Sequence, residues 1–268
     1  MNPTVSPPGP CGRRARTTTV ACAWVLAAWA LADTCAALDV EVIDARLTYV
    51  DTPGLTSVER SGSVTPTGAA SPASDGERAP HERRGYSIEA GAFVGSALWP
   101  DDHAGLMLGV SLLDAVSGGT YSGGTAGPGG TAVTKEDLDA FAVKVHVGPY
   151  ITYHALRLEL LPFLAVGPSR GTFYANNPPA TGAAAALSEL FGSTTEVHSD
   201  IGTYLAYGAQ LGLYFEPHVS GSFLIGGGAG YEGFRSRVHF STNASTGGAT
   251  DVLSGHGVDV FLSVGGRF

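Results

Sequence analysis

The chain is 268 residues long, which leaves room for one large domain or two small ones. Hydrophobic residues make up 44% of it and charged residues only 15%, whereas soluble globular domains carry about 25% charged residues. Acidic residues outnumber basic ones by 24 to 15 and the net charge is −9, which argues against nucleic acid as a partner because phosphate binding needs a basic face.

The first 37 residues have the order of a secretory signal. Three arginines precede an apolar run over 20–32, and small residues follow it up to Ala37. The run has about 13 residues, fewer than the roughly 20 that a spanning helix needs, so we expect cleavage after Ala37, with an uncleaved anchor as the alternative. All three cysteines lie before residue 38, so the mature part, residues 38–268, would hold no disulfide and no cysteine-bound metal.

Hydrophobicity in the mature part alternates with a period of two, which is typical of strands with one apolar face. Near the C-terminus, Val260, Leu262 and Val264 alternate with Phe261 and Ser263. The same alternation predicts strands over 39–50, 86–97, 104–115, 138–152, 155–168, 201–215, 218–231 and 258–268.

The first of these strands is predicted to contain a bulge near Ile43 and Asp44 that resets its alternation. Short links at 99–102, 153–154 and 216–218 alternate with long links at about 51–85, 116–137, 176–198 and 241–251. Short turns at one end and long loops at the other are typical of a membrane barrel with periplasmic turns and extracellular loops. We therefore predict an all-β fold, a closed antiparallel eight-stranded up-and-down transmembrane β-barrel with both termini on the short-turn side.

The closing strand carries a family resemblance. It ends in Phe268 and has the apolar residues Val260, Leu262 and Val264 before it. In this it resembles the small eight-stranded outer-membrane barrels of Gram-negative bacteria, the OmpA and OmpX type. The resemblance implies insertion into the outer membrane, with outer-membrane lipids and the barrel-assembly machinery as partners and the last strand as the assembly signal.

Charged residues fall on the less apolar face of the predicted strands. An eight-stranded barrel is just wide enough to be filled by its own side chains, so this face would line a filled interior. Because buried charges are tolerated when they are paired, we expect an internal network that plugs the lumen. A lumen site or a narrow pore is the alternative for the same residues, which are Glu89, Lys144, His146, Arg157, Glu159, Asp259 and Arg267.

The long links are predicted to be loops without regular structure, with one exception. The link over 51–85 is rich in Ser, Thr, Pro and Gly and is expected to be disordered. The link over 116–137 is glycine-rich and is interpreted as a flexible linker. Within 176–198, residues 181–191 have the start and stop signals of a short helix, with a mobile loop as the alternative.

One constellation allows a catalytic interpretation. His239 and Ser241 lie two residues apart on one strand, and Asp251 on the next strand could orient the histidine as a general base. The stretch resembles that of outer-membrane lipid A deacylases, although Thr242 stands where that family has Asn and Asp251 replaces its Glu at a different spacing. A polar strand end is the alternative, and the sequence predicts no metal site and no cofactor.

Arg235 and Arg237 lie just below this constellation and are predicted to contact lipopolysaccharide phosphates. The sequence as a whole favours a non-enzymatic outer-membrane barrel with a structural and surface-contact role through its long extracellular loops, whose partner it does not name. The alternatives are a narrow channel for small solutes, a lipid A-modifying esterase and a soluble periplasmic ligand-binding barrel. The last of these predicts apolar residues inside and polar ones outside.

Overall fold

The structure, a computed structural model, describes residues 40–64, 76–97, 103–121, 132–176, 194–217, 223–241 and 248–268. No helix in this part of the chain is long and apolar enough to cross a membrane. The expected signal over 1–37 and the expected helix over 181–191 lie outside the described residues.

The described part of the chain consists of strands and their connections. The strands are β1 (Val40–Asp51), β2 (Ser57–Gly62), β3 (Gly76–Arg78), β4 (Glu82–Ala97), β5 (Ala104–Thr120), β6 (Ala132–Tyr153), β7 (Leu156–Asn176), β8 (Thr194–His198), β9 (Gly202–Phe215), β10 (Phe223–Phe240) and β11 (Ala249–Arg267).

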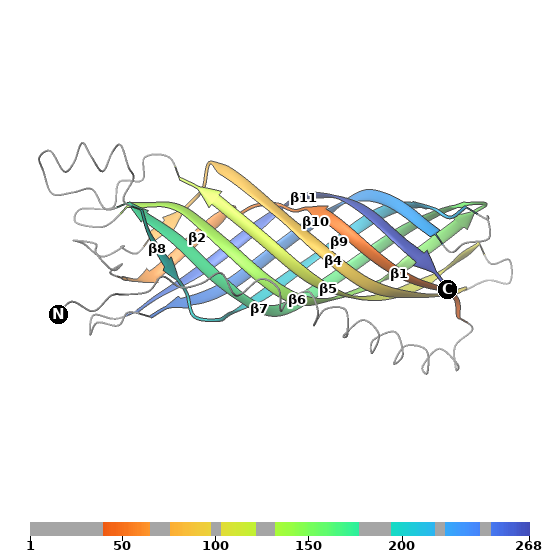
Figure 1. Cartoon of the computed structure of the whole chain (residues 1–268), viewed down its shortest axis with the longest axis horizontal. Helices are drawn as coiled ribbons and strands as arrows, with labels where there is room; N and C mark the ends of the chain where they lie inside the picture. The colour runs from red at the N-terminus through yellow and green to blue at the C-terminus, as the bar shows by residue number, and fades with distance from the viewer. Residues whose placement is uncertain are drawn as a thin grey trace, which may run out of the picture.

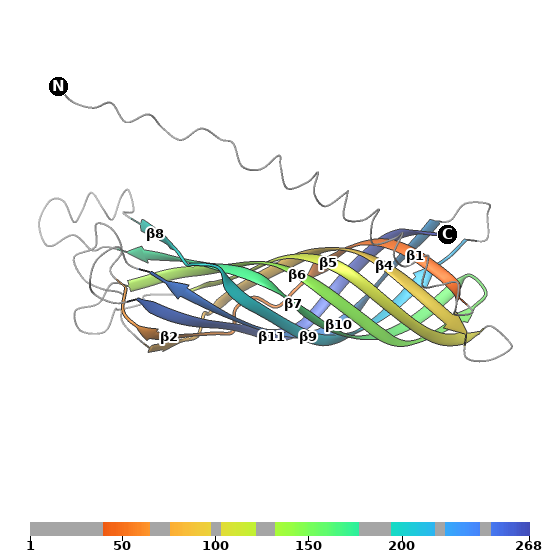
Figure 2. The same ribbon diagram turned by 90° about the horizontal axis from the view of Figure 1, so that it is seen from below.

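Eight of these strands form a closed antiparallel ring. The order is β1, β4, β5, β6, β7, β9, β10 and β11, and each strand pairs with the next (Figures 1 and 2). The last strand returns to the first, because β11 also pairs with β1 from Asp44 opposite Arg267 to Asp51 opposite Val260. The predicted eight-stranded up-and-down barrel is therefore confirmed. The short strands β2, β3 and β8 are additions to this ring.

The two ends of the barrel differ. At the short-turn end, only His154 and Ala155 separate β6 from β7, and His154 adopts the left-handed conformation with φ 54°. The start of β1 and the end of β11 meet at this end, where the Phe268 amide donates a 2.9 Å hydrogen bond to the Ile43 carbonyl. The opposite end, which carries β2, β3 and β8, is called the long-loop end (Figure 1).

The first strand is confirmed over nearly its predicted range. Its irregularity lies between Val40 and Val42, slightly upstream of the predicted bulge near Ile43. From Val42 onward the alternation is regular, so Asp44 and Arg46 point into the barrel while Leu47 points outward. This phase decides which charged residues of β1 enter the lumen.

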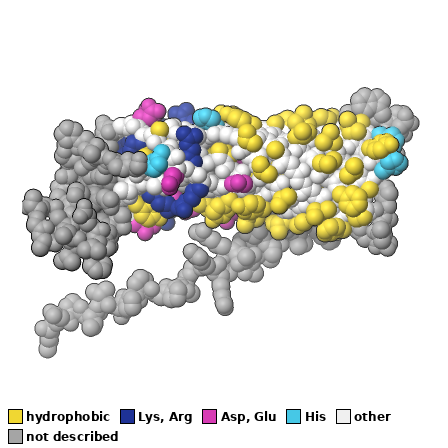
Figure 3. All heavy atoms as spheres, turned by 90° about the horizontal axis from the view of Figure 1, so that it is seen from above, with side chains coloured by type: hydrophobic (Ala, Val, Ile, Leu, Met, Phe, Trp, Pro, Cys, Tyr) yellow, Lys and Arg dark blue, Asp and Glu magenta, His cyan; other side chains and the backbone are white. Residues whose placement is uncertain are grey.

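The outer wall of the ring carries an apolar belt (Figure 3). Its side chains are large, hydrophobic and roughly half exposed, which is the reverse of a soluble protein. Aromatic residues occur along both margins, as in transmembrane barrels. They are Tyr49, Tyr86, Phe141, Tyr207 and Tyr231 toward the long-loop end and Tyr153, Phe215, Phe223 and Phe268 toward the short-turn end.

Several strands run past this belt, which the sequence did not predict. The expected flexible linker over 116–137 is wrong at both sides, since β5 continues to Thr120 and β6 starts at Ala132. In the same way β10 reaches Phe240 and β11 starts at Ala249, well outside the predicted 218–231 and 258–268. By the usual rise and tilt of barrel strands, the nine residues 132–140 add roughly 20–25 Å beyond the belt.

We call the part of the barrel beyond the belt the extension. It is formed by the long-loop ends of the ring strands together with β2, β3 and β8. The expectation of a disordered loop over 51–85 does not hold in the described residues, because β2 pairs with β11 and β3 pairs with β2. Leu55 and Val58 explain this order, since both are completely buried against the interior of the extension.

Candidate functional site

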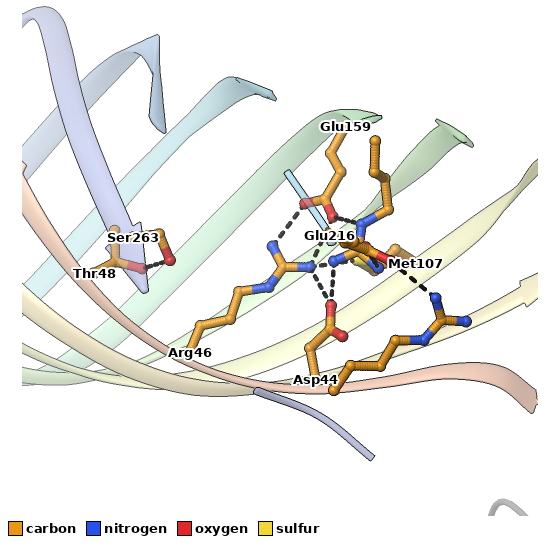
Figure 4. A network of polar contacts seen from close by, with 9 residues as sticks. Asp44, Arg46, Thr48, Met107, Glu159, Glu216 and Ser263 are labelled. Carbon is orange, nitrogen blue, oxygen red and sulfur yellow. Dashed lines mark hydrogen bonds and ion pairs between the residues drawn. The ribbon is translucent and has the colours of Figure 1, made fainter. Parts of the chain in front are cut away.

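The lumen at the short-turn end holds a network of ion pairs (Figure 4). Arg46 donates to both carboxylate oxygens of Glu159 at 2.7 Å each, and to Asp44 at 2.8 Å. Its guanidinium also lies over the rings of Phe93 and Tyr214, at 4.1 and 4.4 Å from their centroids. The two rings and two carboxylates together compensate the charge of a side chain that is almost fully buried.

Arg157 completes this network from β7. It forms an ion pair with Asp44, lies 2.8 Å from Glu159 and lies 2.7 Å from Glu216. Glu216 in turn accepts a 2.9 Å hydrogen bond from Arg267 at the barrel rim. Three arginines and three carboxylates thus share the space, so the cluster is balanced in charge. It occupies the cross-section where the start of β1 meets the end of β11.

A second layer of polar side chains lies further along the lumen. Lys144 donates a 2.5 Å hydrogen bond to Glu89. His146 lies between the rings of Phe93 and Phe163, with centroids 5.2 and 5.9 Å away, and its Nε2 is 3.1 Å from the Ser111 hydroxyl. In the same interior, Gln210 donates a 2.8 Å hydrogen bond to Asp259.

The structure places all seven sequence-predicted lumen residues on the inner side of the wall. Six are buried, and Arg267 lies at the rim with about two-fifths of its side chain exposed. Sequence reasoning missed Asp44, Arg46, Glu216 and Gln210. The alternation of β1 would have shown the first two once the bulge was placed at Val40–Val42, whereas Glu216 follows the end of β9 and has no periodic signal.

The interior of the extension is mainly apolar, with a few buried ion pairs at β2 and β3. A single cluster of buried residues fills most of it, drawn from β2, β5, β6, β7, β9, β10 and β11 and from the connections beside them. It includes Leu138, Phe173, Phe240 and Leu253 from the strands and Leu55 from the connection before β2. Phe173 and Phe240 meet edge to face with centroids 4.9 Å apart. The extension therefore has a hydrophobic core of its own above the membrane-spanning part.

Buried ion pairs attach β2 and β3 to this core. Arg60 on β2 donates through Nε to Asp251 at 2.7 Å and through a second, shorter bond, and its guanidinium lies 4.2 Å from the Phe173 ring centroid. Arg78 on β3 donates a 2.7 Å hydrogen bond to Glu136 on β6. Burial raises the pKa of the Glu136 carboxyl, and the neighbouring Arg78 and Arg60 guanidinium groups oppose that shift.

This arrangement contradicts the catalytic interpretation of His239, Ser241 and Asp251. Asp251 pairs with Val238 across the strands and points inward to Arg60, while His239 pairs with Thr250 and points outward. The histidine Nδ1 lies 3.2 Å from the Thr250 hydroxyl instead. Because neighbouring positions on a strand face opposite sides of the wall, the acid and the base are separated by the wall itself.

Two further expectations concern ligands. Among the described residues, no group of three or more His, Cys, Asp or Glu side chains is arranged to hold a metal ion. Arg235 and Arg237 both point outward at the boundary between the belt and the extension, and both are exposed.

The distribution of side chains now decides the class of protein. Apolar residues cover the outside, charged residues are paired inside, and the ring is closed so that no strand edge faces lipid. The chain is a transmembrane β-barrel of the outer-membrane type. A soluble ligand-binding barrel would have the opposite distribution, so that alternative is wrong.

Solved structures with related architecture include three outer-membrane proteins. The attachment invasion locus protein Ail of Yersinia pestis is 17% identical, with 85% of this chain and 98% of that chain covered and a TM-score of 0.31. OprG of Pseudomonas aeruginosa is 11% identical, with 86% and 97% covered and a TM-score of 0.40. The protease OmpT of Escherichia coli is 7% identical, with 85% and 97% covered and a TM-score of 0.39.

No protein-family model matches the chain, and no curated protein matches it either.

Proposed function

We propose that the protein is a sealed outer-membrane barrel whose extension presents a rigid surface for contact outside the cell. The observation that carries this proposal is the contrast between its two halves. The membrane-spanning half is filled by paired charges between small apolar clusters, and the extension is filled by one large apolar core with a few buried ion pairs at β2 and β3. Neither filling resembles the open, water-lined lumen of a porin.

The filled lumen favours a structural barrel over a narrow channel. A conducting path needs room for ions along the whole axis, and here Arg46, Arg157 and Glu159 occupy the cross-section at the short-turn end while fully or almost fully buried. Leu55, from the segment that enters the extension, adds a second obstruction at the other end. An ion would have to displace both layers to cross.

The extension supports the contact role. A surface that binds a partner loses less conformational entropy when it is already ordered, and the core beneath β2, β3 and β8 supplies that order. Its outward positions include the polar residues Glu59 on β2 and Asp139 on β6, and also the exposed Ile201 just before β9. Since short turns are periplasmic in barrels of this kind, the extension faces the exterior.

Insertion into the membrane is assigned to the closing strand. Val260, Leu262, Val264 and Phe268 all point outward and are exposed, so their side chains are accessible before lipid covers them. Their alternate spacing on the strand that closes the ring supports recognition by the barrel-assembly machinery.

Planar-bilayer recording of the full-length barrel tests the sealed lumen. We expect no unitary conductance steps, and a variant in which Arg46, Arg157 and Glu159 are all replaced by alanine serves as the open-lumen comparison. Folding of both proteins is checked by the heat-dependent shift in gel mobility. Stable steps from the folded wild type would overturn the sealed-barrel proposal.

The contact role is tested separately by attachment of bacteria that produce the barrel to host cells or to one another. A variant with Gly62 joined directly to Gly76 removes the connection between β2 and β3 but keeps both strands. The contact role would be contradicted if bacteria with the wild-type barrel and bacteria with the variant both attached no better than bacteria without the barrel.

A further inference from the structure

We infer that Arg235 and Arg237 form a binding site for the phosphate group of an outer-leaflet lipid of the lipid A type. Figure 3 shows cationic side chains gathered where the apolar belt ends at the long-loop end. The inference depends on the membrane placement of the barrel and not on its proposed surface-contact role.

The two arginines share one outward face of β10. They are two residues apart on one strand, so their Cα atoms are separated by about 7 Å and both guanidinium groups can reach one phosphate. Cross-strand register places Leu205 of β9 and Ser254 of β11 beside Arg235, and Thr203 and Val252 beside Arg237. Two hydroxyl groups therefore flank the pair, those of Thr203 and of Ser254, and the latter lies 2.8 Å from the Ser57 hydroxyl. None of the four direct neighbours is acidic.

Arg235 and Arg237 differ from the buried arginines in their lack of a described acidic partner. In the part of the chain that the structure describes, no ion pair involves Arg235 or Arg237. By contrast, Arg46, Arg60 and Arg157 all form ion pairs with carboxylates. The nearest acids by register are Glu59, two strands away, and Asp200, which accepts a 3.4 Å hydrogen bond from Ser241. Two exposed guanidinium groups that pair with no described carboxylate can give charge-assisted, bidentate hydrogen bonds to a phosphate.

The height of the pair on the barrel identifies a lipid rather than a free anion. Arg235 is level with Leu205, which is 42% exposed and is the first apolar residue of β9 below the boundary. On β10 itself, Tyr231 lies four residues nearer the membrane centre and is 52% exposed, at the aromatic margin of the belt. A phosphate held by the pair therefore sits directly above a surface covered by acyl chains.

Co-purification of lipid tests this inference. The full-length barrel is extracted from Gram-negative outer membranes in mild detergent, and bound lipid A is quantified per barrel by mass spectrometry for wild type and for the Arg235→Gln/Arg237→Gln variant. Loss of two charge-assisted contacts should lower bound lipid A at least about tenfold. The matched control, Arg83→Gln/Arg84→Gln, removes the same charge from β4 and should retain the wild-type amount.

A titration separates the possible sources of the phosphate. Delipidated barrel is heated with bisphosphorylated lipid A, with dephosphorylated lipid A or with inorganic phosphate, and the unfolding midpoint is followed by gel mobility. We expect a rise with bisphosphorylated lipid A alone, abolished in the Arg235→Gln/Arg237→Gln variant. The inference would be overturned if dephosphorylated lipid A or inorganic phosphate raised the unfolding midpoint as much as bisphosphorylated lipid A does. It would also be overturned if the two double-arginine variants lost equal amounts of lipid in the co-purification experiment.

Discussion

Arg46 on β1 donates one hydrogen bond to each carboxylate oxygen of Glu159 on β7, and both bonds measure 2.7 Å. The two residues lie 113 positions apart in sequence, and β1 and β7 are not neighbours in the ring. The contact therefore crosses the lumen and ties opposite walls together. Together with the ion pair between Asp44 and Arg157, it adds contacts across the lumen to the backbone pairings that join β1 to β4 and β11.

Replacing Arg46 with leucine should destabilise the barrel strongly. The change leaves Glu159 and Asp44 buried beside fewer cations, and removal of one partner from a buried ion pair costs about 3–5 kcal/mol. The measurement is the denaturant midpoint of the barrel refolded into lipid vesicles. The double variant Arg46→Leu/Glu159→Leu should regain part of the loss, and a double variant no more stable than the single one would contradict this account.

Replacing Asp251 with asparagine should loosen β2 without opening the membrane-spanning ring. Arg60 would lose the carboxylate that binds it most closely, so the segment around 57–62 should open more often and be cleaved by protease about tenfold faster. Limited proteolysis with identification of the cleavage site measures this. Glu59→Gln, an exposed change on the same strand, is the control, and equal cleavage of both variants would refute the prediction.

Replacing Phe268 with alanine should slow assembly while leaving the assembled barrel nearly as stable. Its side chain is 83% exposed on the outside of the ring and buries little against other residues, whereas its backbone amide still reaches Ile43. The amount of heat-modifiable barrel in outer membranes should fall several-fold, with an unchanged denaturant midpoint after refolding in vitro. Phe223→Ala, at the same rim on β10, should assemble normally.

Replacing Ser241 with alanine should leave the acylation of lipid A unchanged. The serine lies outside the wall while Asp251 lies inside it, so the three residues of the catalytic interpretation never meet. Mass spectrometry of lipid A from cells with wild-type or variant barrel measures the outcome. If a deacylated lipid A species disappeared in the variant, Ser241 would be catalytic and would need another acid. Asp200, whose carboxylate lies 3.4 Å from the Ser241 hydroxyl, would be the candidate.

The period-two pattern of the sequence determined the eight ring strands and the inward and outward faces of all but the first, and the alternation of short and long links predicted the barrel topology. It succeeded there because outward side chains in contact with lipid must be apolar, and this requirement can be read from the sequence at each position separately. The same alternation placed Glu89, Lys144, Arg157 and Asp259 inside, before their partners were known.

Only the tertiary structure decided which charges meet. Asp44, Arg46 and Glu216 escaped the sequence reasoning because a bulge or a strand end interrupts the local pattern, while their partners lie across the lumen. The extension escaped it too, since burial of Leu55 and Val58 depends on long-range contacts with β5, β6 and β11. Alternation reports which side of the wall a residue faces, whereas contact across the lumen depends on the closure and register of the whole ring.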